Sequence, residues 1–145
     1  MEKELVTVRV LGIMEQEKER EEIETLSDGL RLRKEDGLEL YYRESVEESE
    51  EEIKTHVFVN YGNGAAECRI VKSGPVQSEM LFIKDFETEC IYQTPFGEIS
   101  FEIQTFGVEI KDTDEETVIT LSYRLSSNKV PVSEASVTIT AKAKS

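Results

Sequence analysis

The stretch "YQTPFGEISFEIQT", from Tyr92 to Thr105, contains two strand-like runs joined by a short turn. Pro95 presets the backbone for the first central position of a β-turn, and Gly97 suits the fourth position. After the turn, every second residue is apolar: Ile99, Phe101 and Ile103. This period of two is typical of a strand with one buried face. The stretch therefore predicts a hairpin between neighbouring antiparallel strands.

Phe96 stands at the tip of this turn, where water usually is. We interpret its ring as an aromatic lid that folds back over a packed core, because a large apolar side chain gains from burial. Two alternatives stay open at this point: the ring gates a ligand-binding mouth, or it contacts a partner. The lid interpretation predicts that Phe96→Ala destabilises the protein by up to ~3 kcal/mol.

The same alternation continues along the rest of the chain. Two runs, "LRLR" and "VITLSYRL", show its phase. In the first, Leu30 and Leu32 are expected to point inward and Arg31 and Arg33 outward. In the second, the expected inward set is Ile119, Leu121, Tyr123 and Leu125. About ten such runs at near-regular spacing predict an all-β fold: a single antiparallel barrel of about eight to ten strands, occupying residues 1–145 as one domain.

The segments between the runs are rich in turn-forming or acidic residues. Asp36-Gly37 is a strong hairpin signal, because both central positions of a type I′ turn need positive φ. Glu15 to Glu24 has good helix formers but no apolar stripe, which favours a strand with a solvated acidic face. Glu44 to Lys54 is interpreted as a loop or protruding strand ends, and Lys111 to Thr117 as an acidic connection.

The charge balance narrows the possible partners. The chain has 17 Lys and Arg against 31 Asp and Glu, for a formal net charge of −14. Such a surface repels phosphate backbones and anionic membranes, so neither nucleic acid nor a membrane is expected as a partner. A basic protein is the macromolecular partner that this charge favours.

The two cysteines, Cys68 and Cys90, each stand inside a strand-like run. Small secreted domains usually carry more cysteines at framework spacings, so we expect free, buried thiols and a cytoplasmic location. The N-terminal residues do not form a signal peptide, and no apolar run approaches about 18 residues.

Catalytic and cofactor motifs are weak in this sequence. His56 is the only histidine, and no G-x-S-x-G elbow marks an activated serine. His56, Cys68 and Cys90 could supply three zinc ligands, but no C-x-x-C pair holds two of them together. Glycine-rich phosphate loops are absent too. We predict no catalytic residue, no metal and no cofactor, and an enzyme is not indicated.

Polar side chains on the inward faces of strands are the remaining candidates for function. Ser78 stands in register with apolar neighbours, and so do three tyrosines. The plainer interpretation is that their hydroxyls pair with the backbone at the barrel ends. The functional interpretation is that they orient a small, mostly apolar ligand. The candidate ligand-binding residues are Tyr42, Ser78, Tyr92, Phe96 and Tyr123.

Three segments also resemble a known family. They are "SDGLRLRKEDGLELYYRES", "RIVKSGPVQSEMLFIKDFETECIYQTPFGEISFEIQT" and "LSYRLSSNKVPVSEASVTIT". In this order they are similar to the YwiB-like family of small uncharacterised bacterial β-barrel proteins, of calycin or lipocalin-like type. The sharpest matches are the Lys72–Gly74 turn, the run with Ser78, Met80 and Phe82, and the Thr94–Gly97 turn. The resemblance implies the barrel fold and no particular reaction.

Two functions of different kind follow from these observations. The first is a cytoplasmic protein that binds a small, largely apolar ligand in the barrel mouth. The second is an acidic interaction or regulatory module with a filled barrel, no ligand and a basic protein partner. Either would act as a monomer or a homodimer. An open or a filled barrel interior distinguishes them.

Overall fold

The computed structural model describes residues 3–45, 51–62 and 64–144, and every regular element in these ranges is a β-strand. The ten strands are β1 (Lys3–Gln16), β2 (Glu19–Lys34), β3 (Gly37–Ser45), β4 (Glu52–Asn60), β5 (Glu67–Ser73), β6 (Gln77–Ile83), β7 (Glu87–Thr94), β8 (Gly97–Asp112), β9 (Glu116–Ser127) and β10 (Val130–Ala143).

The strands form a closed antiparallel barrel in which each strand pairs with its neighbours in the chain. β1 closes the barrel by pairing with both β10 and β2. Closure leaves the paired strands without a free sheet edge, which protects the backbone from pairing with other chains. The predicted all-β antiparallel barrel is confirmed, at the upper end of the expected number of strands.

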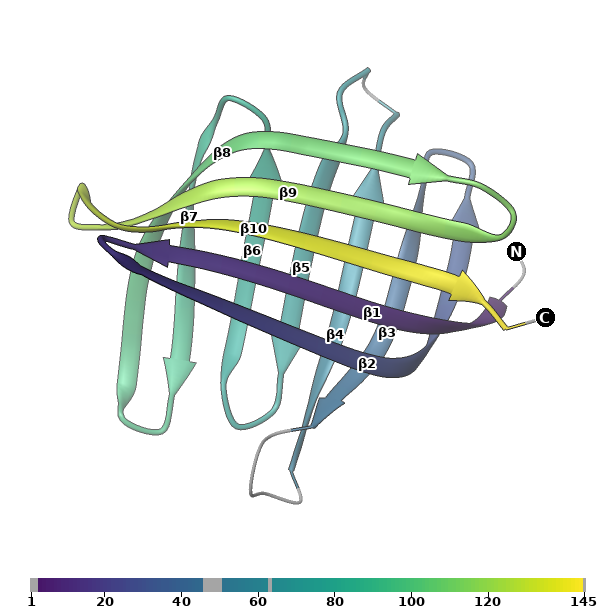
Figure 1. The fold of residues 1–145 in the computed structure, drawn as a ribbon, viewed down its shortest axis with the longest axis horizontal. Helices are drawn as coiled ribbons and strands as arrows, with labels where there is room; N and C mark the ends of the chain where they lie inside the picture. Colours follow the sequence, from purple (N-terminus) through teal and green to yellow (C-terminus); the bar gives the residue numbers. More distant parts are fainter. Residues whose placement is uncertain (1–2, 46–50, 63, 145) are drawn as a thin grey trace.

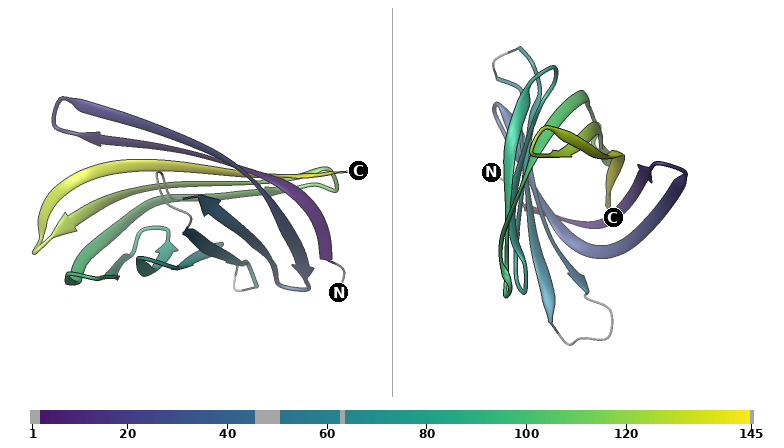
Figure 2. Two further views of the ribbon diagram at one scale, coloured as in Figure 1. Left: turned by 90° about the horizontal axis from the view of Figure 1, so that it is seen from below. Right: turned by 90° about the vertical axis from the view of Figure 1, so that its left-hand side faces the viewer.

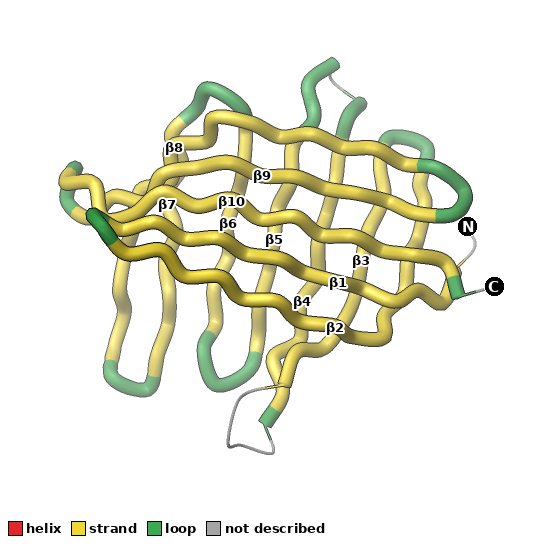
Figure 3. Tube along the Cα trace, in the orientation of Figure 1, coloured by secondary structure: helices red, strands yellow, loops and turns green. Residues whose placement is uncertain are grey.

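The barrel is flattened into two layers that cross at a steep angle (Figure 1, Figure 2). β3 to β7 form the back layer, and the long strands β9, β10 and β1 form the front layer. β8 belongs to both, because residues 97–104 pair with β7 and residues 102–112 pair with β9. β2 bends in the same way at the opposite side. Connections lie at the strand ends, as the tube in Figure 3 shows.

The acidic segment Glu15 to Glu24 is part of a long hairpin, as the strand interpretation predicted. Gln16 pairs with Glu19, so Glu17 and Lys18 form the turn, and Glu17 has a φ of 54°. Helix propensity does not decide this segment, because without an apolar stripe a helix here has no face to bury. The connection predicted within Lys111 to Thr117 is also present, between β8 and β9. The segment Glu44 to Lys54 includes residues 46–50, which lie outside the described part of the chain.

The Asp36-Gly37 hairpin is present, but its turn is one residue earlier than predicted. Lys34 pairs with Gly37, which leaves Glu35 and Asp36 in the turn. Gly37 is required for another reason: a Cβ there would lie 1.9 Å from the carbonyl oxygen of Val59. The glycine allows β4 to approach closely.

The predicted phase of β2 is wrong at Arg31, whose side chain is fully buried. Arg31 donates to Oε2 of Glu4 at 2.8 Å and to the Thr117 hydroxyl and the Asp114 carbonyl, each at 3.0 Å. These acceptors take the place of water at one end of the barrel. Arg33 is partly buried in the same cluster, 3.0 Å from Glu4.

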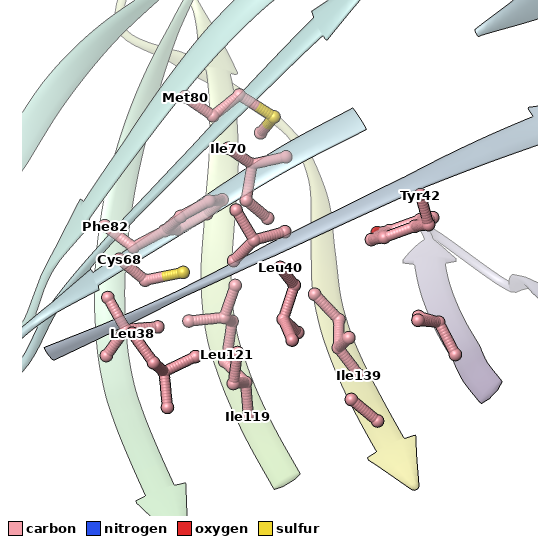
Figure 4. Close-up of a cluster of buried hydrophobic side chains, with 14 of the residues drawn as sticks. Leu38, Leu40, Tyr42, Cys68, Ile70, Met80, Phe82, Ile119, Leu121 and Ile139 are labelled. Carbon is pink, nitrogen blue, oxygen red and sulfur yellow. The ribbon is translucent and has the colours of Figure 1, made fainter. Parts of the chain in front are cut away.

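The interior between the layers is filled by the apolar side chains of both (Figure 4). The inward set predicted on β9 is confirmed, because Ile119, Leu121, Tyr123 and Leu125 are all buried. On β8, Ile103 is buried and Phe101 is half-buried, but Ile99 is exposed. The β7–β8 hairpin, to which Ile99 belongs, extends past the front layer (Figure 1), and the Ile99 side chain is 49% exposed.

Candidate functional site

Three of the five predicted ligand-binding residues form one inward-facing row across the back layer. Cross-strand pairing connects Tyr42 through Thr55 and Lys72 to Ser78, and Ser78 to Tyr92. Tyr42 and Ser78 are buried and Tyr92 is half-buried. The row is therefore a band of hydroxyls inside an otherwise apolar wall.

The fourth predicted residue, Tyr123, reaches the interior from β9 in the opposite layer. Its ring packs on Phe82 with centroids 4.9 Å apart. Tyr92 packs edge-on against Phe101, and its hydroxyl lies 3.7 Å from the sulfur of Met80. Burial raises the pKa of Tyr92 and Tyr123, so both phenols stay neutral and can donate hydrogen bonds.

Phe96 lies apart from the other four, and its side chain is 100% exposed. Thr94 fixes the tip: its hydroxyl donates to the Gly97 carbonyl at 2.8 Å and accepts from the Phe96 amide at 3.1 Å. The lid prediction is wrong because the hairpin tip projects beyond the front layer and has no interior beneath it.

A hollow opens where β2 and β3 separate, and we call it the seam hollow. Their pairing stops at Gly29 and Tyr42, after which residues 19–28 pair only with β1. The separation leaves a volume of about 660 Å³. A Cβ at Gly29 would lie 2.7 Å from the Tyr41 carbonyl oxygen, so this glycine permits the crossing of the two strands.

The seam hollow has a polar inner wall and a mixed outer rim, because alternate residues of each strand face opposite sides of the wall. The inner wall contains Thr25, Ser27, Tyr42 and Glu44, and the rim contains the apolar or aromatic Leu5, Leu26, Leu30 and Tyr41 and the charged Asp28, Arg43 and Glu52. The Thr25 hydroxyl is buried and has no hydrogen-bond partner among the described residues. Leu5 and Leu26 are exposed. The hollow thus offers exposed leucines at a partly charged entrance and a polar inner end.

Glu44 brings a carboxylate to the inner wall. It accepts a hydrogen bond from the Thr55 hydroxyl at 2.9 Å and lies 3.3 Å from Nζ of Lys72. Its charge is therefore compensated within the wall. Burial, with a smaller contribution from Glu44, raises the pKa of Tyr42 well above its usual value, so Tyr42 remains a neutral donor.

Sequence reasoning identified Tyr42 but missed Thr25 and Glu44. The separation of β2 from β3 is a property of pairing, which the alternation pattern does not contain. A signal existed in Thr25, Ser27 and Gly29, three small or polar residues at alternate positions. This signal was missed because Arg31 was assigned to the outward face, which placed Thr25, Ser27 and Gly29 on that face as well.

His56 is a partly exposed residue of β4. Its Nε2 lies 2.6 Å from Oε1 of Glu39, and its ring contacts Tyr41 and stacks on Phe58. Among the described residues, no group of three or more His, Cys, Asp and Glu side chains could hold a metal ion. No helix in the same ranges has the length and hydropathy of a membrane span.

Cys68 and Cys90 are free and buried, in agreement with the expectation from their strand positions. Burial raises the pKa of Cys68 to about 12 and that of Cys90 to about 11. The thiolate is the reactive form of cysteine, so both side chains behave as small apolar residues.

We therefore expect both thiols to resist labelling in the folded protein. At pH 8 only roughly one Cys68 thiol in ten thousand is ionised, because its pKa lies about four units higher. A disulfide-exchange reagent should modify fewer than one thiol per chain over minutes, and both thiols rapidly in guanidinium chloride. Rapid labelling of two thiols in native buffer would contradict the buried positions.

The fold and the seam hollow together define a small closed β-barrel protein with a side opening. The chain belongs to the family described as Domain of unknown function (DUF1934), which matches residues 8–139. It is also similar to the crystal structure of the ywiB protein from Bacillus subtilis, with a TM-score of 0.85 and 23% identity. The similarity covers 99% of this chain and 94% of that one. A search of curated proteins finds no match. The resemblance to the YwiB-like family is confirmed. The similarity establishes the fold and does not indicate an activity.

Proposed function

We propose that this protein binds a small, mostly apolar molecule with one polar end in the seam hollow. The observation that carries the proposal is the unpartnered Thr25 hydroxyl on the wall of a hollow that also reaches Tyr42. Buried hydroxyls normally have partners, so a Thr25 side chain that turns its hydroxyl toward a ligand group in the hollow removes a cost of the empty site. The volume is in the range of small-molecule sites.

The two faces of the seam suggest how the molecule lies. Its apolar body rests between Leu26 and Leu5 at the rim, where burial of the exposed side chains favours binding. Its polar end reaches Thr25 and Tyr42, which can both donate and accept hydrogen bonds. The calycin-like mode of binding and the cytoplasmic location expected from the sequence belong to this proposal.

Binding is tested with the neutral fluorescent dye Nile red and with mass spectrometry. We expect native mass spectra of freshly purified protein to show a bound small molecule, and Nile red to displace it. Leu26→Asn should weaken dye binding by about fivefold or more, because it removes apolar contact at the rim. Tyr42→Phe should change the affinity for the natural molecule more than for the dye.

Val130→Asn is the matched control, because Val130 is as exposed as Leu26 but lies outside the seam hollow. Equal weakening by both variants would show that the dye binds the surface without selection. Absence of both a co-purified molecule and saturable dye binding would remove the proposal.

A further inference from the structure

A second hollow lies on the outer surface of the back layer, and we call it the outer hollow. It extends from the β2–β3 turn across the outward faces of β3 to β6 and has a volume of about 610 Å³. It shares no lining residue with the seam hollow. A function of this surface is therefore independent of the proposed ligand site.

The floor of the outer hollow is apolar and aromatic. Phe58 and Leu81 point outward from β4 and β6, on either side of Arg69 in β5. The Arg69 guanidinium carbon lies 4.4 Å from the centroid of the Phe58 ring, and the His56 ring stacks on the same phenylalanine. A cation is attracted to the face of such a ring, and the Arg69 guanidinium already occupies this position over Phe58.

The rim of the outer hollow carries unbalanced negative charge. Lys34 pairs with Glu39, and Arg69 lies 3.4 Å from Glu79. Both lining cations are thus engaged by carboxylates of the same hollow. The three remaining acidic residues, Glu35, Asp36 and Glu67, form no ion pair within the described ranges.

We propose that the outer hollow is a docking site for an extended, basic segment of another protein. An apolar side chain of the segment packs on Leu81 and beside the Phe58 ring, and flanking lysines or arginines approach Glu35, Asp36 and Glu67. Charge complementarity selects this occupant, because nothing in the rim balances the three carboxylates.

Other macromolecular occupants are disfavoured by the same charges. A second copy of this chain presents the same carboxylates and a net charge of −14, so the two copies repel each other. A nucleic acid brings phosphates to an acidic rim. An extended basic segment avoids both penalties and matches the length of a surface that spans four strands.

The proposal is tested with the full-length protein and a fluorescent probe peptide in which three residues of alternating lysine and threonine stand on each side of a central leucine. Fluorescence anisotropy gives the affinity, and amide NMR shifts locate the peptide. We expect shifts at Phe58, Arg69 and Glu67. Binding should weaken about tenfold in the triple variant Glu35→Gln/Asp36→Asn/Glu67→Gln, since each rim charge contributes modestly. High salt should weaken it further.

A matched control is the triple variant Glu19→Gln/Glu21→Gln/Glu22→Gln on the β1–β2 hairpin. It changes the net charge by the same amount at exposed positions far along the chain from the outer hollow. Near-unchanged affinity in this control supports docking at the outer hollow. Equal weakening in both triple variants, or shifts spread over the whole acidic surface, would overturn the proposal in favour of non-specific attraction. Unchanged thermal unfolding confirms that the variants are folded.

Discussion

Arg31→Ala is expected to lower the free energy of unfolding by about 3 kcal/mol or more. The guanidinium group is fully buried and donates to Glu4, Thr117 and the Asp114 carbonyl. Removing it takes one of two guanidinium donors from Glu4, leaves the Thr117 hydroxyl and the Asp114 carbonyl without the Arg31 donor, and creates a cavity at the end of the barrel. Leaving one partner of a buried pair uncompensated costs far more than losing an exposed pair.

The groups around Arg31, chiefly Arg33 and Asp112, limit the loss of stability in Arg31→Ala without cancelling it. Asp112 is bonded to Arg33, at 3.0 Å, and accepts from the Thr117 hydroxyl at 2.6 Å. Burial alone would raise the pKa of Asp112, but these hydrogen bonds and the charges of Arg33 and Arg31 outweigh it and lower the pKa. Asp112 therefore stays ionised at neutral pH, and removing Arg31 leaves Asp112 and Glu4 sharing Arg33.

Urea unfolding followed by circular dichroism measures the effect, with Arg9→Ala as the matched control. Arg9 forms an exposed pair with Glu24 at 3.0 Å, so its loss should destabilise the protein far less than the loss of Arg31. Arg31→Met keeps most of the volume, and the loss that remains in it measures the broken polar contacts. Equal stability of the two alanine variants would mean that water replaces Arg31 at the barrel end.

Strand alternation predicted most of the fold, because a barrel with one buried face repeats the same two-residue signal in every strand. It failed at Arg31, where the rule that charged residues point outward was applied to a residue with three acceptors from two distant segments. Leu30 and Leu32 looked like the better inward pair. Only the pairing of β1, β2 and the β8–β9 connection reveals the partners that make Arg31 the buried residue.

The candidate site was predicted less completely than the fold. The inward hydroxyl of Tyr42 followed from its phase in β3, but the opening beside it depends on where β2 and β3 stop pairing. Local sequence carries no direct signal for that point. Gly29 identifies the end of the β2–β3 pairing only once the close approach of the Tyr41 carbonyl is known. A surface such as the outer hollow is equally hidden, because Phe58 and Arg69 meet across strands.

The second large effect is expected in a pair of phenylalanines. Phe82→Ala should lower the free energy of unfolding by about 3–5 kcal/mol, whereas Phe96→Ala should change it by less than about 0.5 kcal/mol. Phe82 is 1% exposed and packs on Tyr123 from the opposite layer, whereas Phe96 is fully exposed at a hairpin tip. The two variants remove the same atoms, so the difference between them isolates the environment of the ring.

The effect is measured by urea unfolding of both variants. The dependence of the unfolding free energy on urea concentration should stay unchanged. A loss of more than about 1.5 kcal/mol in Phe96→Ala would show that the tip covers apolar surface in solution, and would restore the lid interpretation. A loss below about 1 kcal/mol in Phe82→Ala would mean that the interior is loosely packed and able to adapt. A loose interior favours a ligand between the layers, whereas a rigid one confines binding to the seam, where Thr25 and Tyr42 are.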